Sequence, residues 1–201
     1  MSLKLKIVSL WLPGFILKKD LDIVARNTIE GLNDVIKRYI PWRMEEIIEQ
    51  DEVLKGNAEK RRAIMANAHN IRVKALIEEL GSEEAIKIAR KSMFEVGYQL
   101  GKNARKRLGV GNDLNDLQLA AKIMYKILGI EFKIENKDGN IVMIVNRCAL
   151  SKYYTLEACM VLSAADEGVV RGLNENMEMQ FKERITDGAS ECIACINEVK
   201  S

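Results

Sequence analysis

Apolar side chains recur every three or four residues through most of the first 128 positions. This is the period of a helix with one buried face. Asp20 and Ser82 are suited to begin two of these helices as N-caps, and Gly129 is suited to end the last one. The pattern predicts helices from Leu21 to Pro41, from Met44 to Leu54, from the Lys55-Gly56-Asn57 break to Leu80, from Ser82 to Leu108, and from Asn112 or Asp113 to Leu128.

The period changes to two after Gly129, which indicates strands. In order, the pattern predicts a hairpin over 130–135 and 141–145, a helix from Thr155 to Leu173, and a hairpin over 177–185 and 192–196. This order predicts an α+β fold. We expect an N-terminal helical region packed on a small antiparallel sheet, which is made of two β-hairpins with an intervening helix.

The helical lead-in suggests two parts, an N-terminal helical extension over 1–57 and an α+β domain over 58–201. The extension contains an apolar run, Ile7 to Leu17, which is too short to span a bilayer and is expected to contact either the core or another subunit. We therefore predict a homodimer through the N-terminal helices and no membrane contact. No small-x-small cleavage site follows the run, which favours the cytoplasm over secretion.

Composition and charge narrow the function classes. The 31 basic and 29 acidic side chains give a net charge of +2, so electrostatics offer no argument for a nucleic-acid partner. The single histidine, His69, excludes zinc sites that need two histidines from one chain. Its mid-helix position predicts a surface or hydrogen-bonded side chain rather than a catalyst. Enzymes, ligand-binding modules and structural interaction modules stay open.

All four cysteines lie between Cys148 and Cys195, in the last third of the chain. Cys192 and Cys195 are three residues apart in a predicted strand, so they face opposite sides and cannot easily hold one metal ion. Cys148, Cys159 and Cys192, together with Asp166, could still hold zinc or another divalent ion. The alternative is that buried thiols act as small hydrophobic side chains, which we prefer for Cys195.

Two carboxylates occupy positions that their neighbours predict to be buried. Asp166 falls on the apolar stripe of the helix at 155–173, and Glu183 falls in the inward phase of the strand that begins at Met177. A buried carboxylate without a partner is costly, so both residues are candidates for chemistry. The structural alternatives are a helix-rim aspartate that reaches solvent and a bulge or strand end that turns Glu183 outward.

The last third of the chain also resembles a known family. The shared features are a strand that ends in Cys148, then Cys159 and Asp166, the segment from Gly172 to Met177, and a hairpin with Arg184, Thr186, Gly188 and Cys192. These motifs resemble the L-2-amino-thiazoline-4-carboxylic acid hydrolase-like family, over roughly residues 60–197. A more distant likeness to the 4-vinyl reductase-type ligand-binding domain rests on residues 95–101, Gly168, Gly172, Glu183, Gly188 and Cys192.

The first resemblance implies a small-molecule substrate, with hydrolysis of a C–N bond in a small carboxylated heterocycle. A general base, Asp166 or Glu183, would activate water, and Arg184 would bind the substrate carboxylate. Cys148 or Cys192 would act as a nucleophile or a metal ligand. The side chains expected to bind substrate are Arg184, Thr186, Asn174 and Glu183.

The second likeness implies a domain that binds a small hydrophobic ligand without catalysis. That alternative predicts a mainly apolar cavity beside Gly97, Gly101, Gly168 and Gly172. On packing grounds, the spacing of Gly97 and Gly101 itself predicts the close approach of another backbone. Convergence of the predicted acid, arginine and thiol side chains on one polar pocket would favour the enzyme.

Overall fold

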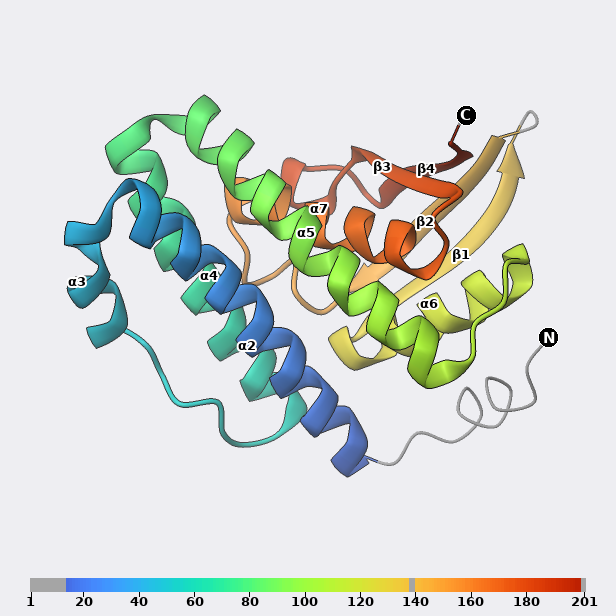
Figure 1. Cartoon of the computed structure of the whole chain (residues 1–201), viewed down its shortest axis with the longest axis horizontal. Helices are drawn as coiled ribbons and strands as arrows, with labels where there is room; N and C mark the ends of the chain where they lie inside the picture. The colour runs from blue at the N-terminus through green and yellow to red at the C-terminus, as the bar shows by residue number, and fades with distance from the viewer. Residues whose placement is uncertain (1–13, 138–139, 200–201) are drawn as a thin grey trace.

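Long helices form most of the fold, and a four-stranded sheet lies against them (Figure 1). The computed structural model describes residues 14–137 and 140–199. Its helical elements are α2 (Gly14–Tyr39), the short 3-10 turn η1 (Pro41–Arg43), α3 (Met44–Glu49), α4 (Ala58–Leu80), α5 (Ser82–Leu108), α6 (Leu114–Leu128), α7 (Leu156–Leu173) and the 3-10 turn η2 (Ile185–Asp187). Its strands are β1 (Ile130–Lys137), β2 (Asn140–Cys148), β3 (Met177–Glu183) and β4 (Cys192–Glu198). The α+β class is confirmed.

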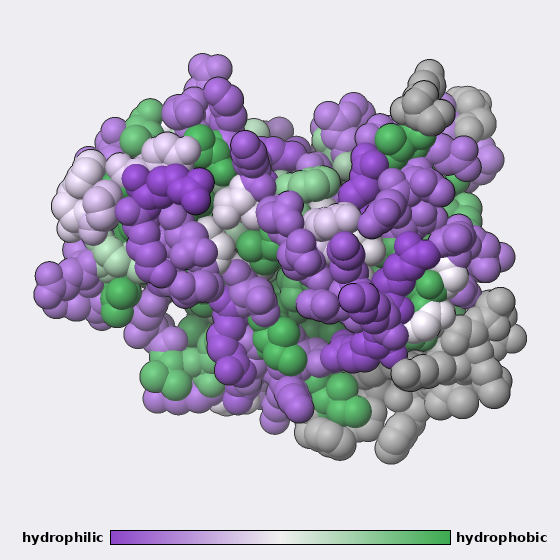
Figure 2. All heavy atoms as spheres, viewed as in Figure 1, coloured by the Kyte–Doolittle hydropathy of each residue, from purple (hydrophilic) through white to green (hydrophobic). Residues whose placement is uncertain are grey.

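Helix α5 runs diagonally across the molecule in front of α7, with α2 and α4 on one side and the sheet on the other (Figure 1). The face seen in Figure 2 is mostly hydrophilic, and hydrophobic residues show between the polar ones in smaller areas. No described helix is both long enough and apolar enough to cross a membrane. The predicted docking run from Ile7 falls mainly outside the described residues, and the homodimer and the division at residue 57 stay predictions.

The sheet joins the two predicted hairpins through their second strands. The strand order is β1-β2-β4-β3, with every neighbouring pair antiparallel. The central strand β2 is buried from Val142 to Val145, as its continuous apolar run predicts. The pairing of β3 with β4 shifts register between Phe181 and Glu183. This bulge leaves Glu183 exposed, so the expected inward position of Glu183 is wrong.

Two helix boundaries differ from the sequence pattern, and at each a carboxylate pairs with a distant arginine. Helix α2 begins at Gly14, and Asp20 lies inside it, where its carboxylate accepts hydrogen bonds of 3.0 and 3.1 Å from Arg107. Helix α3 ends at Glu49, five residues early, and Asp51 beyond it accepts two hydrogen bonds of 2.7 Å from the fully buried Arg72. Both carboxylates pair with an arginine that is distant in the sequence, Asp20 from within α2 and Asp51 from beyond the end of α3.

The remaining helix ends follow local chemistry. Asp113 caps α6 by accepting a hydrogen bond from the backbone N–H of Asp116, and Gly129 ends that helix in the left-handed conformation. Thr155 caps α7 through the backbone N–H of Ala158. Ser82 does not act as a cap, because Gly81 occupies the N-cap position with a φ of 78°.

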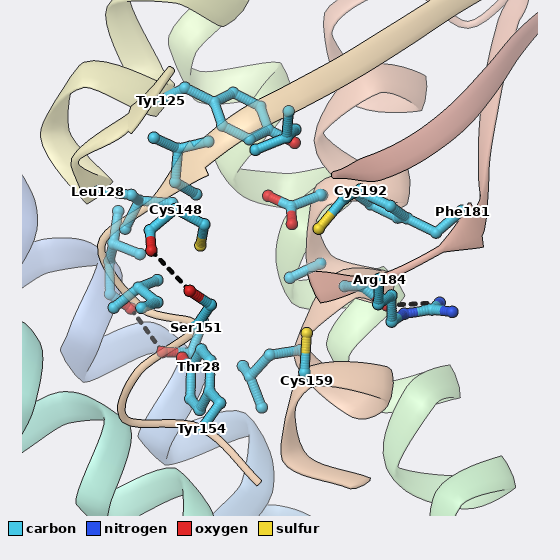
Figure 3. A pocket seen from close by; sticks show the side chains of 18 of the residues that line it. Thr28, Tyr125, Leu128, Cys148, Ser151, Tyr154, Cys159, Phe181, Arg184 and Cys192 are labelled. Atoms are coloured by element: carbon cyan, nitrogen blue, oxygen red, sulfur yellow. Dashed lines mark hydrogen bonds between the residues drawn. The ribbon is translucent and has the colours of Figure 1, made fainter. Parts of the chain in front are cut away.

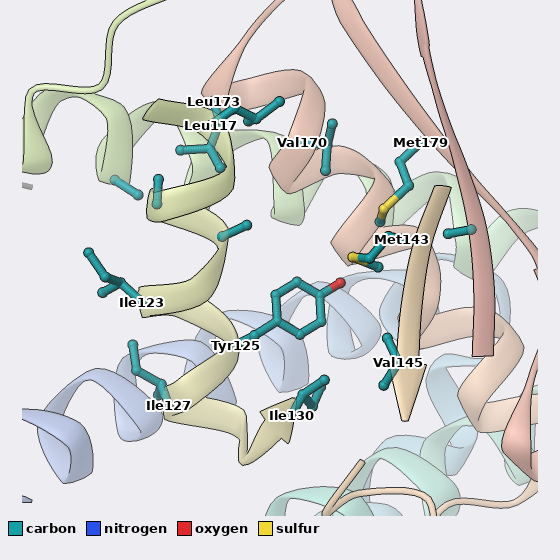
Figure 4. Close-up of a cluster of buried hydrophobic side chains, with 14 of the residues drawn as sticks. Leu117, Ile123, Tyr125, Ile127, Ile130, Met143, Val145, Val170, Leu173 and Met179 are labelled. Atoms are coloured by element: carbon teal, nitrogen blue, oxygen red, sulfur yellow. The ribbon is translucent and has the colours of Figure 1, made fainter. Parts of the chain in front are cut away.

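Two hydrophobic clusters hold these elements together. One lies between α6, α7 and the sheet, where Tyr125 points from α6 toward β2 among side chains such as Met143, Val145 and Met179 (Figure 4). The other joins α2, α4, α5 and α7 around residues such as Leu32. Burying each large apolar side chain contributes roughly 1.5–3 kcal/mol, so the clusters fix the helices relative to the sheet.

Helices α5 and α7 pack almost backbone to backbone. The contact uses four glycines: Gly97, Gly101, Gly168 and Gly172. A Cβ atom on Gly97 would collide with the carbonyl group of Ala165, and one on Gly168 would collide with that of Phe94. The close packing predicted from the glycine spacing is therefore confirmed, and it fixes the position of α7 next to the cavity described below.

Candidate functional site

A cavity of about 120 Å³ lies between the sheet and the helices α2, α4, α6 and α7. A volume of this order admits a molecule about the size of benzene. Most of its wall is hydrocarbon, from side chains such as Leu128, Val145 and Leu162. Figure 3 shows Cys148 and Tyr154 on one side of it and Cys192 and Arg184 on the other.

The cavity brings together most of the predicted site residues. Those that line it are Asp166, Cys148, Cys159, Cys192, Arg184 and Thr186. They come from the end of β2, from α7 and from the β3–β4 hairpin, so the fold assembles them from separate segments. Their convergence fits the enzyme alternative, whereas the apolar wall fits the ligand-binding alternative. Their chemical roles stay predictions.

Two predicted residues lie elsewhere. The side chain of Asn174 donates to the carbonyl of Asn112 over 3.1 Å and accepts from the backbone N–H of Asn176 over 3.0 Å. Asn174 therefore shapes the turn that leads into β3 and does not line the cavity. Glu183 points to solvent past the bulge, which leaves Asp166 as the cavity carboxylate of the predicted pair.

Asp166 is placed to exchange a proton near neutral pH. Burial raises the pKa of its carboxyl from 3.8 to about 7. The hydroxyl of Tyr125 lowers that pKa and the charge of Glu167 raises it, both by less than burial. A carboxyl with a pKa near 7 can both accept and donate a proton at physiological pH.

The three cavity thiols are held in the protonated form. Burial raises the pKa of Cys148 to about 11 and also raises the pKa values of Cys159 and Cys192. A thiol is a nucleophile mainly as its thiolate, so these values do not favour attack by cysteine at pH 7. The backbone N–H of Ile185 donates to the Cys192 sulfur over 3.3 Å.

The expected metal site does not form from these thiols. No three His, Cys, Asp or Glu side chains of the described residues make a group that could hold a metal ion. Cys148, Cys159 and Cys192 line the cavity from three different elements without forming such a group. All four cysteines are free, and those in the cavity contribute apolar surface.

Arg184 has few partners in this cavity. One of its terminal nitrogens donates to the Ser163 hydroxyl over 3.1 Å, and its guanidinium lies 5.5 Å from the centre of the Phe181 ring. No carboxylate among the described residues pairs with it, whereas the neighbouring Arg90 pairs with Glu167 at 2.7 Å. Arg184 therefore keeps capacity to bind an anion.

Three buried polar atoms of the cavity residues make no hydrogen bond of regular geometry with the described residues. They are the Tyr125 hydroxyl, the Arg184 Nε and the Thr186 Oγ1, which we call the unpaired set. Tyr125 and Thr186 still have a polar neighbour in the cavity, because Tyr125 lowers the pKa of Asp166 and Thr186 lowers that of Cys159. Each such atom costs roughly 1–3 kcal/mol if nothing supplies a partner. The unpaired set therefore indicates where a ligand or water would bind.

The cavity also has a polar group that sequence reasoning did not identify. Thr28, His69 and Tyr154, the histidine network, form a chain of two hydrogen bonds of 2.9 Å each. All three residues line the cavity, and His69 is only 1% exposed. Of the two alternatives predicted for His69, a surface side chain or a hydrogen-bonded one, the structure shows the hydrogen-bonded one. The signal was Thr28 itself, a polar residue on an otherwise apolar helix stripe.

Solved structures resemble this fold at low sequence identity. A trafficking protein particle complex subunit 3 from Naegleria fowleri, covalently bound to palmitic acid, matches with a TM-score of 0.55 and 16% identity, covering 71% of this chain and 97% of that one. An H-NOX protein from S. oneidensis matches with a TM-score of 0.48 and 13% identity, over 87% of this chain and 99% of that one. The first likeness shows a shared fold.

Sequence comparison gives a family. Curated proteins provide no significant match. A family model described as L-2-amino-thiazoline-4-carboxylic acid hydrolase matches residues 61–196, which include every cavity residue from α7 and the sheet. On this match, the chain belongs to the L-2-amino-thiazoline-4-carboxylic acid hydrolase family.

Proposed function

We propose that the protein hydrolyses a C–N bond of a small carboxylated heterocycle bound in the cavity. The observation that carries this proposal is the convergence of Asp166, whose pKa is about 7, and Arg184, which has no carboxylate partner among the described residues, on one largely apolar cavity. The family description supports the reaction class and names L-2-amino-thiazoline-4-carboxylic acid. The cavity volume of about 120 Å³ suits a molecule of this size.

Arg184 supplies the anion-binding group in this proposal. Its Nε–H is buried without a partner, and a guanidinium can bind a carboxylate through two parallel hydrogen bonds. The hydroxyl of Thr186 lies in the same wall and could donate a third. The apolar remainder of the cavity would then hold the ring and exclude bulk water.

Asp166 supplies the proton transfers. Its carboxylate form takes a proton from the water molecule that attacks the ring carbon between the two heteroatoms. The resulting acid gives this proton to the ring nitrogen, which forms the tetrahedral adduct. Asp166 then takes the proton of the new hydroxyl and gives it to the same nitrogen as the C–N bond breaks and the carbonyl forms, so the product is the substrate plus one water. No oxidant or reductant is required. The protonated thiols take no part in this scheme and shape the wall.

Mass spectrometry of an incubation with L-2-amino-thiazoline-4-carboxylic acid tests the proposal. The wild-type protein should form a product heavier by one water molecule. Asp166→Asn keeps the shape but loses proton transfer, so its rate should fall by roughly 10²–10⁴-fold. Cys195→Ser, a change outside the cavity, serves as the control and should keep the wild-type rate. No wild-type turnover, or an equal rate for Asp166→Asn, would contradict the proposal.

A second candidate function is the binding of a hydrophobic ligand without catalysis. The specific observation that favours it is the mainly hydrocarbon wall, together with thiols that burial keeps protonated. A fold neighbour that carries palmitic acid adds support from analogy alone. Native mass spectrometry of the purified full chain separates the two functions. A retained hydrophobic molecule with no thiazoline turnover would favour binding.

A further inference from the structure

The hydrogen bonds of the histidine network have a direction that can be deduced. The Thr28 hydroxyl lies 2.9 Å from the carbonyl oxygen of Val24 and 3.1 Å from that of Ala25, and carbonyl oxygens only accept. Thr28 has one hydroxyl hydrogen, and this hydrogen is used toward the backbone. The Thr28 oxygen therefore accepts the 2.9 Å hydrogen bond from Nε2 of His69.

The tautomer of His69 then fixes the role of Tyr154. Burial lowers the pKa of His69 to about 3, so the ring is neutral at pH 7 and carries one N–H. With that hydrogen at Nε2, Nδ1 accepts and the Tyr154 hydroxyl donates to it over 2.9 Å. The reverse direction would leave the Tyr154 O–H without an acceptor among the described residues. The deduced direction satisfies every donor of the network.

We propose that the Tyr154 oxygen is a ligand-binding subsite that accepts a hydrogen bond from an N–H or O–H group. The hydrogen of Tyr154 is committed to His69, so its lone pairs are what it offers to the cavity that it lines. Across the cavity from Tyr154, the Nε–H of Arg184 is a donor that makes no hydrogen bond with the described residues (Figure 3). A ligand that matches both sides carries a carboxylate and an amino or amidine group.

This inference deepens the proposed function and depends on it for the ligand, but the direction of the hydrogen bonds can be tested alone. His69 is the only histidine of the chain, so ¹⁵N-histidine labelling gives one imidazole in the spectrum. The full-length protein should show the neutral Nε2–H tautomer at pH 7. In Tyr154→Phe the Nδ1 resonance should shift, because Nδ1 loses its donor. An Nδ1–H tautomer or a charged ring would overturn the inference.

The same resonances report ligand binding, because His69 lines the cavity. The probes are L-2-amino-thiazoline-4-carboxylic acid and thiazoline-4-carboxylic acid, which lacks the amino group. The wild-type protein should bind the amino compound roughly three- to tenfold more tightly, which is the value of one hydrogen bond. Tyr154→Phe should bind both probes equally.

Tyr153→Phe is the matched control, since the Tyr153 hydroxyl bonds Glu59 outside the cavity and its removal should keep the preference. If Tyr154→Phe keeps the preference as well, the inference is wrong. If neither probe binds while His69 shows the Nε2–H tautomer, the proposed substrate is wrong, and the acceptor role of Tyr154 is retained. The two failures are therefore distinguishable.

Discussion

The two polar sides of the cavity differ in how their hydrogen bonds are satisfied. In the histidine network each donor has an acceptor, and the chain runs from the backbone of α2 through His69 to Tyr154. On the other side, the unpaired set makes no hydrogen bond of regular geometry with the described residues, and the pKa of Asp166 is lowered by the Tyr125 hydroxyl but by no cation among them. A satisfied network holds shape, whereas unsatisfied groups leave interactions for a ligand.

The same contrast appears in the pKa values. Burial lowers the pKa of His69 to about 3 and raises that of Asp166 to about 7, so both groups favour their neutral forms in the folded state. His69 lies in a network that supports the neutral ring. Asp166 lacks a comparable set of partners. The difference suggests that His69 is primarily structural and that Asp166 is the reactive group.

The largest expected effect is the pH dependence that Asp166 gives to the free energy of unfolding. The folded-state pKa of about 7 exceeds the ordinary value of 3.8, so the folded state holds this proton more firmly than the unfolded state. The bound proton therefore contributes up to about 4 kcal/mol to the free energy of unfolding. This contribution is fully present below about pH 4 and is lost as the pH rises to about 7. Asp166→Asn should therefore be more stable than wild type above pH 7 and equal to it near pH 4.

Urea unfolding of both proteins between pH 4 and pH 8 provides the measurement. The wild-type free energy of unfolding minus that of Asp166→Asn isolates this one carboxyl from other titrating groups. A difference that stays constant across this range would mean that Asp166 has an ordinary pKa and that the contrast between the two sides is wrong.

A smaller loss of stability is expected when the histidine network is removed. His69→Ala leaves the Thr28 and Tyr154 hydroxyls without their partner and opens a void, which should lower the free energy of unfolding by about 3 kcal/mol at pH 7. The wild type should also lose stability as pH falls from about 6.5 toward 3, because the folded-state pKa of His69 is lowered. That acid-side component should be missing in the variant. A loss under about 1 kcal/mol at pH 7 would show that the network is not structural.

One chemical change made on each side compares them directly. Tyr154→Phe removes the donor to His69 and should cost about 2 kcal/mol, because Nδ1 is left buried without a partner. Tyr125→Phe removes a buried hydroxyl without a regular partner, so it should cost no stability and could raise the free energy of unfolding by up to about 1–3 kcal/mol. Because Tyr125 lowers the pKa of Asp166, this variant should also raise that pKa above about 7, as followed by carboxyl NMR. Equal losses of stability in Tyr154→Phe and Tyr125→Phe would contradict the difference between the two sides of the cavity.

Periodicity predicted the fold well because most elements bury one regular face. It predicted the ends of α4 and α5, both hairpins and the glycine contact of α5 with α7. It failed at Asp20, which lies within α2, and at the end of α3; in both places a carboxylate pairs with a distant arginine. Pairing across the chain leaves no local signal in a single sequence.

The candidate site was predicted in part for the same reason. Asp166 was visible because a carboxylate interrupted an apolar stripe, and the structure places it in the cavity. Glu183 showed a similar interruption, but a bulge in the sheet reversed its direction. The histidine network joins α2, α4 and the segment before α7, and its directionality depends on distances that only a three-dimensional structure supplies.

The central claim is that Arg184 on the unsatisfied side binds the carboxylate of a small ligand. Calorimetric titration with L-2-amino-thiazoline-4-carboxylic acid tests it directly in the wild type, Arg184→Gln and Arg171→Gln. Arg171 lies outside the cavity and donates to the backbone of Glu175, so it provides the matched control. We predict that Arg184→Gln weakens binding roughly tenfold or more and that Arg171→Gln leaves it unchanged. Equal affinity for wild type and Arg184→Gln would contradict the account.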